Sequence, residues 1–180
     1  MDESQGSGAI LMNTPIGILP AALAAAAVLA APLALGANTK PDAFMQKAIE
    51  GNLAEIKVGQ LAEQKGATEG VRHFGTVLEQ DHSKANQQAM TAASSMGVTP
   101  PAEPSPKEQR TYQRLASLSG KSFDKAFLKA MVKDHKKDIA EFKKESKTSN
   151  SAAANYAQAV LPDLHKHLQL AESLERHPSG

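Results

Sequence analysis

Four ionisable side chains interrupt otherwise apolar faces in this 180-residue sequence, one in each of four long segments with helical periodicity. They are Glu55, His82, His135 and His167. Steps of three and four residues follow one face of a helix, and the other positions on these faces hold small or hydrophobic residues. An ionisable group on an apolar face is costly unless it is paired, hydrogen-bonded or bound to a metal ion. These four residues are therefore the first candidates for chemistry.

Three imidazoles and one carboxylate that meet inside a helical bundle would form a site for a transition metal, namely Fe, Mn, Zn or Cu. Glu79 adds a second carboxylate, because Glu79-x-x-His82 has the i, i+3 spacing found in carboxylate-bridged di-iron bundles. Asp81 and Asp134 each precede a histidine and project about 100° away from it round the helix. They are better placed to hold a histidine than to bind the same ion.

The same side chains also fit a buried hydrogen-bond network in which Glu55 satisfies a histidine. Counted from the turn between their helices, Glu55 lies 11 residues away and His82 lies 16. In the other pair, His135 lies 13 residues from the turn and His167 lies 19. These offsets correspond to about 7–9 Å along the helix axes at about 1.5 Å per residue, which counts against convergence on one ion. The sequence leaves both interpretations open.

The breaks in the helical pattern define the elements that must position these residues. Long helices are expected over about 41–65, 68–96 and 122–147, with a fourth that is capped at Ser149 or Asn150 and ends near Arg176. Ser105-Pro106-Lys107-Glu108 has the pattern of a capping box and predicts a short helix that ends near Leu118. Gly51, Gly59 and Gly75 fall inside the expected helices and indicate close contact between helices.

The order of these elements predicts the fold class. Short links join the first two long helices and the last two, so each pair should form an antiparallel hairpin, while residues 97–106 hold four prolines and form a long connection. Two hairpins joined in this way make an all-α, ferritin-like antiparallel four-helix bundle with a short extra helix in the middle connection. Because cysteine is absent, disulfides, thiolate metal ligands and a thiol nucleophile are excluded.

Residues 1–37 have the composition of a signal peptide. An uncharged apolar run from Ile16 to Leu35 precedes small residues that suit cleavage near Gly36. The preceding residues carry Asp2 and Glu3 and no basic residue, which would be explained by translation from Met12. We therefore expect a domain over 38–180 with its core at 41–176, located in the periplasm or secreted. The alternative is an uncleaved segment that tethers the domain to the inner membrane.

The small net charge argues against nucleic acid as a partner, and the lack of a second long apolar segment after residue 37 argues against insertion of the mature domain into a membrane. The formal net charge of the whole chain is +1, which supplies no strongly basic field. A lysine-rich face that includes Lys125, Lys129 and Lys133 suits either solvent or an envelope protein or other anionic partner. The chain has no Ser/His/Asp arrangement, phosphate-binding glycine loop or dinucleotide fingerprint, so no catalytic residue is assigned.

Several short motifs resemble a family of bacterial proteins of unknown function described as predicted outer-membrane or membrane proteins and placed in the ferritin-like class. The resemblance spans about residues 41–175 and is carried by Phe44 with Ala48, Glu55-Ile56 with Gly59-x-Leu61-Ala62, Asp81-His82 with Asn86, Phe123-Asp124, Met131 with Asp134-His135, and Leu161-Pro162-x-Leu164-x-x-His167. It implies an exported four-helix bundle with no established activity. Ferritins use Glu-x-x-His on two helices, and only Glu79-x-x-His82 matches, so the resemblance does not imply iron oxidation or storage.

These observations favour an exported, periplasmic helical-bundle protein that acts as a non-catalytic binding or envelope stress-related accessory protein. The alternative is a metal-binding protein or an oxidoreductase whose site is formed by Glu55, Glu79, His82, His135 and His167. A transition metal is the only cofactor that the residues suggest.

Overall fold

The computed structural model describes residues 40–148 and 151–177. The chain divides into two units, Met1–Leu35 and Gly36–Gly180, and all described residues belong to the second. The expected signal segment, the start at Met12, the cleavage near Gly36 and the expected cap at Ser149 or Asn150 lie outside the described residues.

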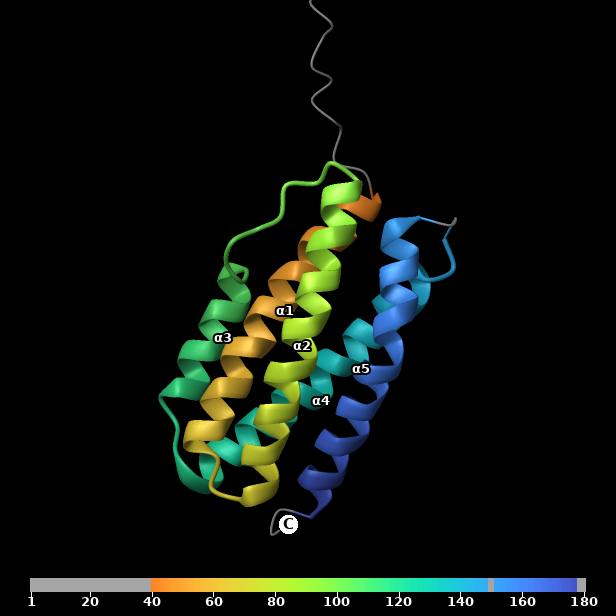
Figure 1. Ribbon diagram of the computed structural model, residues 1–180. Helices are drawn as coiled ribbons and strands as arrows, with labels where there is room; N and C mark the ends of the chain where they lie inside the picture. Colours follow the sequence, from red (N-terminus) through yellow and green to blue (C-terminus); the bar gives the residue numbers. More distant parts are fainter. Residues whose placement is uncertain (1–39, 149–150, 178–180) are drawn as a thin grey trace, which may run out of the picture. The chain divides into compact units, whose positions relative to one another are not determined.

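Five helices make up the described part of the chain, which contains no strand (Figure 1). They are α1 (Lys40–Lys65), α2 (Glu69–Ser95), α3 (Pro106–Ala116), α4 (Gly120–Glu145) and α5 (Ala152–Arg176). The all-α prediction is confirmed, and so is the short extra helix, which begins at the predicted capping box between Ser105 and Glu108. α5 begins differently from the prediction, because the side chain of Ser151 accepts a hydrogen bond from the backbone N–H of Ala154.

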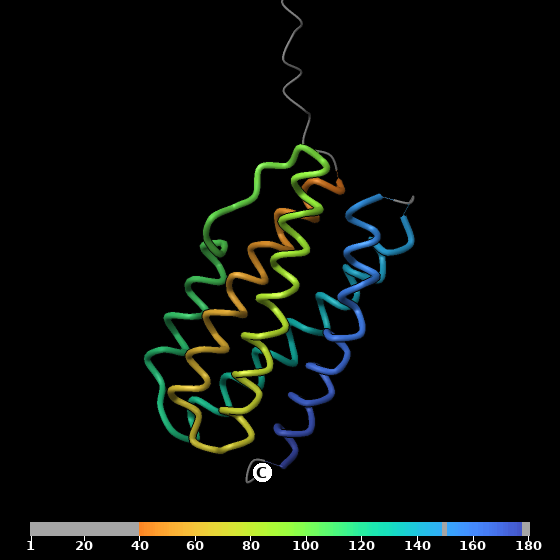
Figure 2. The backbone as a smooth tube through the Cα atoms, viewed as in Figure 1, coloured from red at the N-terminus to blue at the C-terminus, as the bar shows by residue number. Residues whose placement is uncertain are grey.

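The four long helices form two antiparallel hairpins, α1 with α2 and α4 with α5 (Figure 2). The hairpins meet chiefly along α2 and α5, whereas α1 and α4 touch much less extensively. α3 lies on the outside of α1 (Figure 1). The architecture is therefore a four-helix bundle with an extra helix in its middle connection, and its least tightly closed side lies between α1 and α4.

Two glycines bring α1 and α2 unusually close together. A Cβ atom on Gly59 would lie 2.7 Å from the carbonyl oxygen of Gly75, and one on Gly75 would lie 2.6 Å from the carbonyl oxygen of Gly59. The close contact predicted at these two positions is confirmed. The same prediction is wrong at Gly51, because a Cβ atom there would have no neighbour within 4 Å.

Two hydrophobic clusters fill the core and leave a polar layer between them. One cluster holds the residues Met45, Ile49, Ala89, Phe142, Tyr156 and Leu164 among others. The other holds Leu61, Phe74, Leu78, Phe127, Met131 and Ala171 among others. In every long helix one of the four ionisable residues that interrupt the apolar faces falls between the members of the two clusters. Glu55, His82, His135 and His167 are therefore held at one level by apolar packing on both sides.

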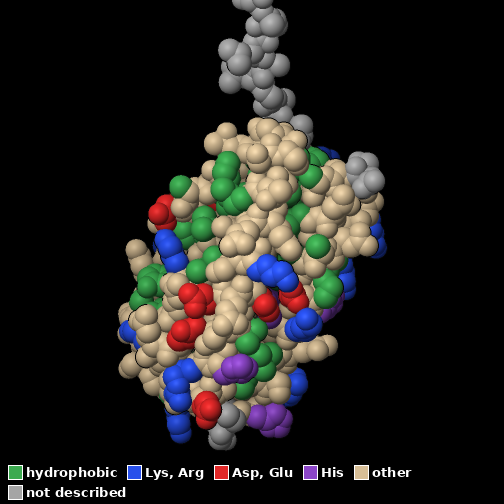
Figure 3. Space-filling view, viewed as in Figure 1, with side chains coloured by type: hydrophobic (Ala, Val, Ile, Leu, Met, Phe, Trp, Pro, Cys, Tyr) green, Lys and Arg blue, Asp and Glu red, His purple; other side chains and the backbone are tan. Residues whose placement is uncertain are grey.

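The surface of the bundle mixes both charges. On the face shown in Figure 3, basic and acidic side chains lie near one another and hydrophobic side chains are scattered. No helix within residues 40–148 and 151–177 has the length and hydropathy needed to cross a bilayer.

Candidate metal centre

Four of the five residues predicted as metal ligands meet in the polar layer. Nε2 of His82 lies 2.9 Å from Oε2 of Glu55, and Nε2 of His135 lies 3.6 Å from the same oxygen. Nε2 of His135 also lies 3.3 Å from Nδ1 of His167. One ring nitrogen from each histidine lies within 4.8 Å of the other two. All four side chains are at most 8% exposed.

The axial offset expected from residue counting does not keep these side chains apart. Side chains in a helix lean toward its N-terminus. Glu55 is closer to the α1–α2 turn and leans away from it, whereas His82 is farther from the turn and leans toward it. In the other hairpin, His135 is closer to the α4–α5 turn and leans away from it, whereas His167 is farther from the turn and leans toward it. In both hairpins the lean shortens the gap, so counting Cα positions overestimated the separation.

The outer ring nitrogen of each histidine donates a hydrogen bond to a protein oxygen. Nδ1 of His82 lies 3.0 Å from Oδ1 of Asn52, whose Nδ2 donates in turn to the hydroxyl of Tyr156 at 2.9 Å. Nδ1 of His135 donates to the carbonyl oxygen of Met131 at 3.0 Å. Nε2 of His167 donates to Oδ2 of Asp81 at 2.9 Å. Such contacts set the tautomer and orientation of metal-binding histidines.

The inner atoms are consequently acceptors that face one another. With their hydrogens committed outward, the neutral forms of His135 and His167 have no proton for the 3.3 Å contact between their inner nitrogens. Oε2 of Glu55 and Nε2 of His82 lie 2.9 Å apart, and neither buried atom has another hydrogen-bond partner. A tetrahedral ion with bonds of about 2.0–2.1 Å would place neighbouring ligand atoms about 3.3 Å apart. The separations of 2.9, 3.3 and 3.6 Å given above lie close to this value.

Electrostatic effects within the cluster favour an ionised Glu55, neutral rings at His135 and His167, and a proton on His82. Burial acts to raise the pKa of Glu55, but the neighbouring His135, His82 and His167 together lower it to about 2. Burial also acts to lower the pKa of His82, but the Glu55 carboxylate outweighs it and the pKa is raised. Burial and the charge of His82 lower the pKa values of His135 and His167. The Glu55 carboxylate therefore attracts positive charge, and in the metal-free cluster His82 takes up a proton more readily than a free imidazole does.

The fifth predicted ligand does not join the cluster. Glu79 accepts a hydrogen bond from Nε2 of Gln60 at 2.7 Å in an exposed contact between α2 and α1. His165 is half-buried, and His73 and His177 are exposed. Asp81 holds His167, a residue on another helix, rather than its own neighbour His82.

Sequence reasoning missed Asn52 and Tyr156. Both are buried, and they support His82 from α1 and α5. Asn52 lies one helical turn before Glu55, and a search that included amides on the core faces would have found it. Nothing in the sequence distinguished Tyr156 from an ordinary core residue, because a buried aromatic side chain is expected in any hydrophobic core.

The fold and the site define an all-helical bundle protein with a buried cluster of three histidines and one glutamate. A family model described as DUF4142, a domain of unknown function, matches residues 25–174. The chain belongs to this family. The match supports the resemblance noted in the sequence as far as a helical domain of unknown function, and it includes neither the outer-membrane description nor the ferritin-like class.

The chain is similar in fold to a solved structure. The crystal structure of a DUF305 fragment from Deinococcus radiodurans is similar with a TM-score of 0.67 and 14% sequence identity. The similarity covers 77% of this chain and 97% of the fragment. No protein of curated function matches the chain.

Proposed function

We propose that this protein binds one divalent transition-metal ion through His82, His135, His167 and Glu55. The observation that carries the proposal is the 3.3 Å contact between Nε2 of His135 and Nδ1 of His167. Both rings donate their hydrogens to Met131 and Asp81, so the two facing atoms carry lone pairs. A proton on His82 would pair with Glu55 but would leave this second contact unsatisfied. One cation among the four residues satisfies all of the inner atoms at once.

The donor set restricts the kind of ion. Imidazole nitrogens with a single carboxylate suit Zn, Cu, Fe and Mn, and without thiolates the site lacks the ligands that soft ions prefer. Glu79 lies apart from the cluster in an exposed contact. The proposal is therefore a mononuclear centre rather than the di-iron centre that the Glu79-x-x-His82 spacing suggested, and it assigns no reaction to the protein.

A second part of the proposal concerns where the protein is located in the cell and what role it has there. We place the domain in the periplasm, after export by the segment 1–37 and cleavage near Gly36, with a bundle of the ferritin-like class. There it acts as a non-catalytic binding or envelope stress-related accessory protein. The segment's apolar composition supports export. Detection of the mature N-terminus by mass spectrometry of periplasmic extracts tests the location, and an intact N-terminal segment in the membrane fraction contradicts it.

A second candidate function is binding of an anionic envelope partner to the face that includes Lys125, Lys129 and Lys133. The three side chains are exposed and lie at i, i+4 spacing on α4. Reversal of their charge should abolish capture of an envelope partner in pull-downs. Retention of the partner by the charge-reversed protein contradicts this candidate.

Metal analysis of protein purified without a histidine tag tests the principal proposal. We expect close to one equivalent of a transition metal, or one-to-one uptake of added Zn, Cu, Fe or Mn with a rise in melting temperature. His82→Ala and His135→Ala should each abolish binding. His165→Ala is the matched control, because this half-buried histidine on the same helix as His167 lies outside the cluster. Metal content below about 0.1 equivalent with no thermal shift refutes the proposal.

A further inference from the structure

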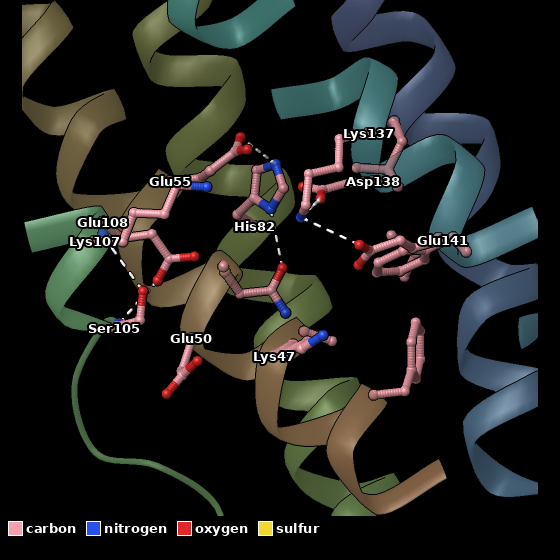
Figure 4. Close-up of a pocket in the computed structure, with 17 residues that line it drawn as sticks. Lys47, Glu50, Glu55, His82, Ser105, Lys107, Glu108, Lys137, Asp138 and Glu141 are labelled. Atoms are coloured by element: carbon pink, nitrogen blue, oxygen red, sulfur yellow. Dashed lines mark hydrogen bonds and ion pairs between the residues drawn. The ribbon is translucent and has the colours of Figure 1, made fainter. Parts of the chain in front are cut away.

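A cavity leads from the surface to the candidate centre on the side where α1 and α4 are least tightly packed. It has a volume of about 320 Å³ and reaches Asn52, Glu55 and His82 at its inner end. Figure 4 shows Glu55 on α1 and His82 on α2 directed toward each other there, with Lys137, Asp138 and Glu141 arranged along α4. Oε2 of Glu55, in a side chain only 8% exposed, lies 2.9 Å from Nε2 of His82 and has no other hydrogen-bond partner. An acceptor atom of the proposed centre therefore lies at the end of this cavity.

Gly51 keeps the cavity open. It lies four residues before Glu55 on the same face of α1 and lines the cavity. Unlike Gly59, it is not required by a neighbouring backbone, because a Cβ atom at this position would have no neighbour within 4 Å. Glycine in the middle of a helix costs about 0.5–1 kcal/mol relative to alanine. Packing against neighbouring helices therefore does not require glycine at position 51. Its missing side chain leaves the cavity open one helical turn from Glu55.

The lining of the cavity favours cations. Apart from Glu55 itself, four carboxylates line the cavity together with three lysines, and one of these lysines, Lys137, is paired with Asp138 at 3.2 Å and with Glu141 at 3.5 Å. A cleft lined with an excess of one charge focuses its field and raises the local concentration of the opposite charge. The excess here is negative and lies along the path that ends at Glu55.

We infer that the cavity between α1 and α4 is the route by which a divalent metal ion reaches the buried His–Glu cluster, and that Gly51 and Asp138 set the rate of uptake. This inference rests on the proposed function. Gly51 acts by leaving the path open, and Asp138 acts by attracting the cation on the way. Neither residue is a ligand of the bound ion.

The opposite side of the cluster offers a narrower opening. A cavity of about 50 Å³ between α2 and α5 is lined by Asp81, Ala159 and His167, among others. Asp81 is bonded to His167 across it at 2.9 Å. A cation that passed here would have to break the contact that orients one of its own ligands. This opening therefore serves as the matched control.

Stopped-flow absorbance with cobalt(II) as the probe tests the inference, since the visible bands of a four-coordinate ion report both uptake and equilibrium affinity. Full-length wild type, Gly51→Leu, Asp138→Asn and Ala159→Leu are compared, with helicity checked by circular dichroism. Leucine at 51 fills the wide route, and leucine at 159 fills the narrow one. Gly51→Ala gives a graded obstruction that also favours the helix.

We expect Gly51→Leu to slow association and dissociation by about tenfold or more while the dissociation constant changes little, because the bound state is unaltered. Asp138→Asn should slow association by about threefold and weaken its dependence on salt. Ala159→Leu should match wild type. Uptake that is slowed by Ala159→Leu and unaffected by Gly51→Leu overturns the route but leaves the metal centre standing. Failure of wild type to take up cobalt(II), zinc(II) or any of copper, iron and manganese refutes the proposed function itself.

Discussion

Replacement of Asp138 by asparagine should stabilise the metal-free protein at neutral pH. Burial, reinforced by the negative charge of Glu55, raises the pKa of Asp138 from 3.8 to about 6, although Lys137 acts in the opposite direction. At 1.36 kcal/mol per pH unit, this change corresponds to about 3 kcal/mol of destabilisation when the carboxylate is charged in both states. Its side chain is only 28% exposed, so solvent screening is limited. Asparagine carries no charge and removes the penalty.

The sign of the effect follows from proton linkage. The folded protein binds the Asp138 proton more tightly than the unfolded chain does, so this group makes stability fall as pH rises from about 3.8 to about 6. The free energy of unfolding of Asp138→Asn should exceed that of wild type by about 1 kcal/mol at pH 4.5 and by about 3 kcal/mol at pH 7. Below the unfolded pKa the two proteins should converge.

Urea denaturation monitored by circular dichroism, in the presence of EDTA and at several pH values, measures this difference. Lys137→Met is a useful companion, because it removes the cation beside Asp138 and should destabilise the protein at neutral pH. An Asp138→Asn protein that is no more stable than wild type at pH 7, or whose advantage does not change with pH, refutes the reasoning. A variant that is more stable but slower to take up metal would show that stability is sacrificed for access.

Three further predictions address packing, ligand support and metal linkage. Gly75→Ala should lower the free energy of unfolding by about 1–3 kcal/mol, because the new Cβ atom would clash with backbone atoms of α1. Gly51→Ala should raise the free energy of unfolding by up to about 1 kcal/mol, because alanine favours the helix and meets no neighbour there. Thermal denaturation of the two variants measures both effects. Asp81→Ala should weaken zinc(II) binding by about 10–100-fold, because His167 loses the carboxylate that orients it. Asp163→Ala is the control and should leave zinc(II) affinity unchanged, because it breaks only an exposed pair with Lys166. Equilibrium titration with zinc(II) compares the two variants. Zinc(II) should raise the melting temperature at pH 7.5 and should lose this effect below about pH 5, because the inner ring nitrogens must be unprotonated to bind the ion. If the rise in melting temperature is the same at low pH, the ion binds elsewhere.

Much of the architecture follows from local patterns. The capping box at Ser105 predicts the start of α3, and the three-and-four spacing of small and apolar residues predicts the long helices. The short links within each pair of long helices, and the long proline-rich connection between the pairs, predict two hairpins. The histidine or glutamate that interrupts each apolar face was also visible in the sequence. Helix ends were less certain, because a cap depends on which of several neighbouring hydroxyl or amide side chains reaches the backbone, as Ser151 does.

Tertiary packing decided which of those residues meet. Glu79 and Glu55 both carry a carboxylate on or near a core face, but only Glu55 leans into the polar layer, while Glu79 pairs with Gln60 outside it. The direction of side-chain lean closed an axial offset that counting residues left open. The support of His82 by Asn52 and Tyr156 joins three helices and has no counterpart in sequence spacing.

By itself, the sequence determined an all-helical bundle without cysteine, so any metal here must be held by imidazole and carboxylate. Helical periodicity and chain breaks are local properties, and they can be read without knowing the fold. Only the tertiary structure decided that three ring nitrogens and one carboxylate oxygen face one another, and that a cavity beside Gly51 reaches them. These features depend on how four helices are rotated and spaced, which is set by packing between residues far apart in the chain.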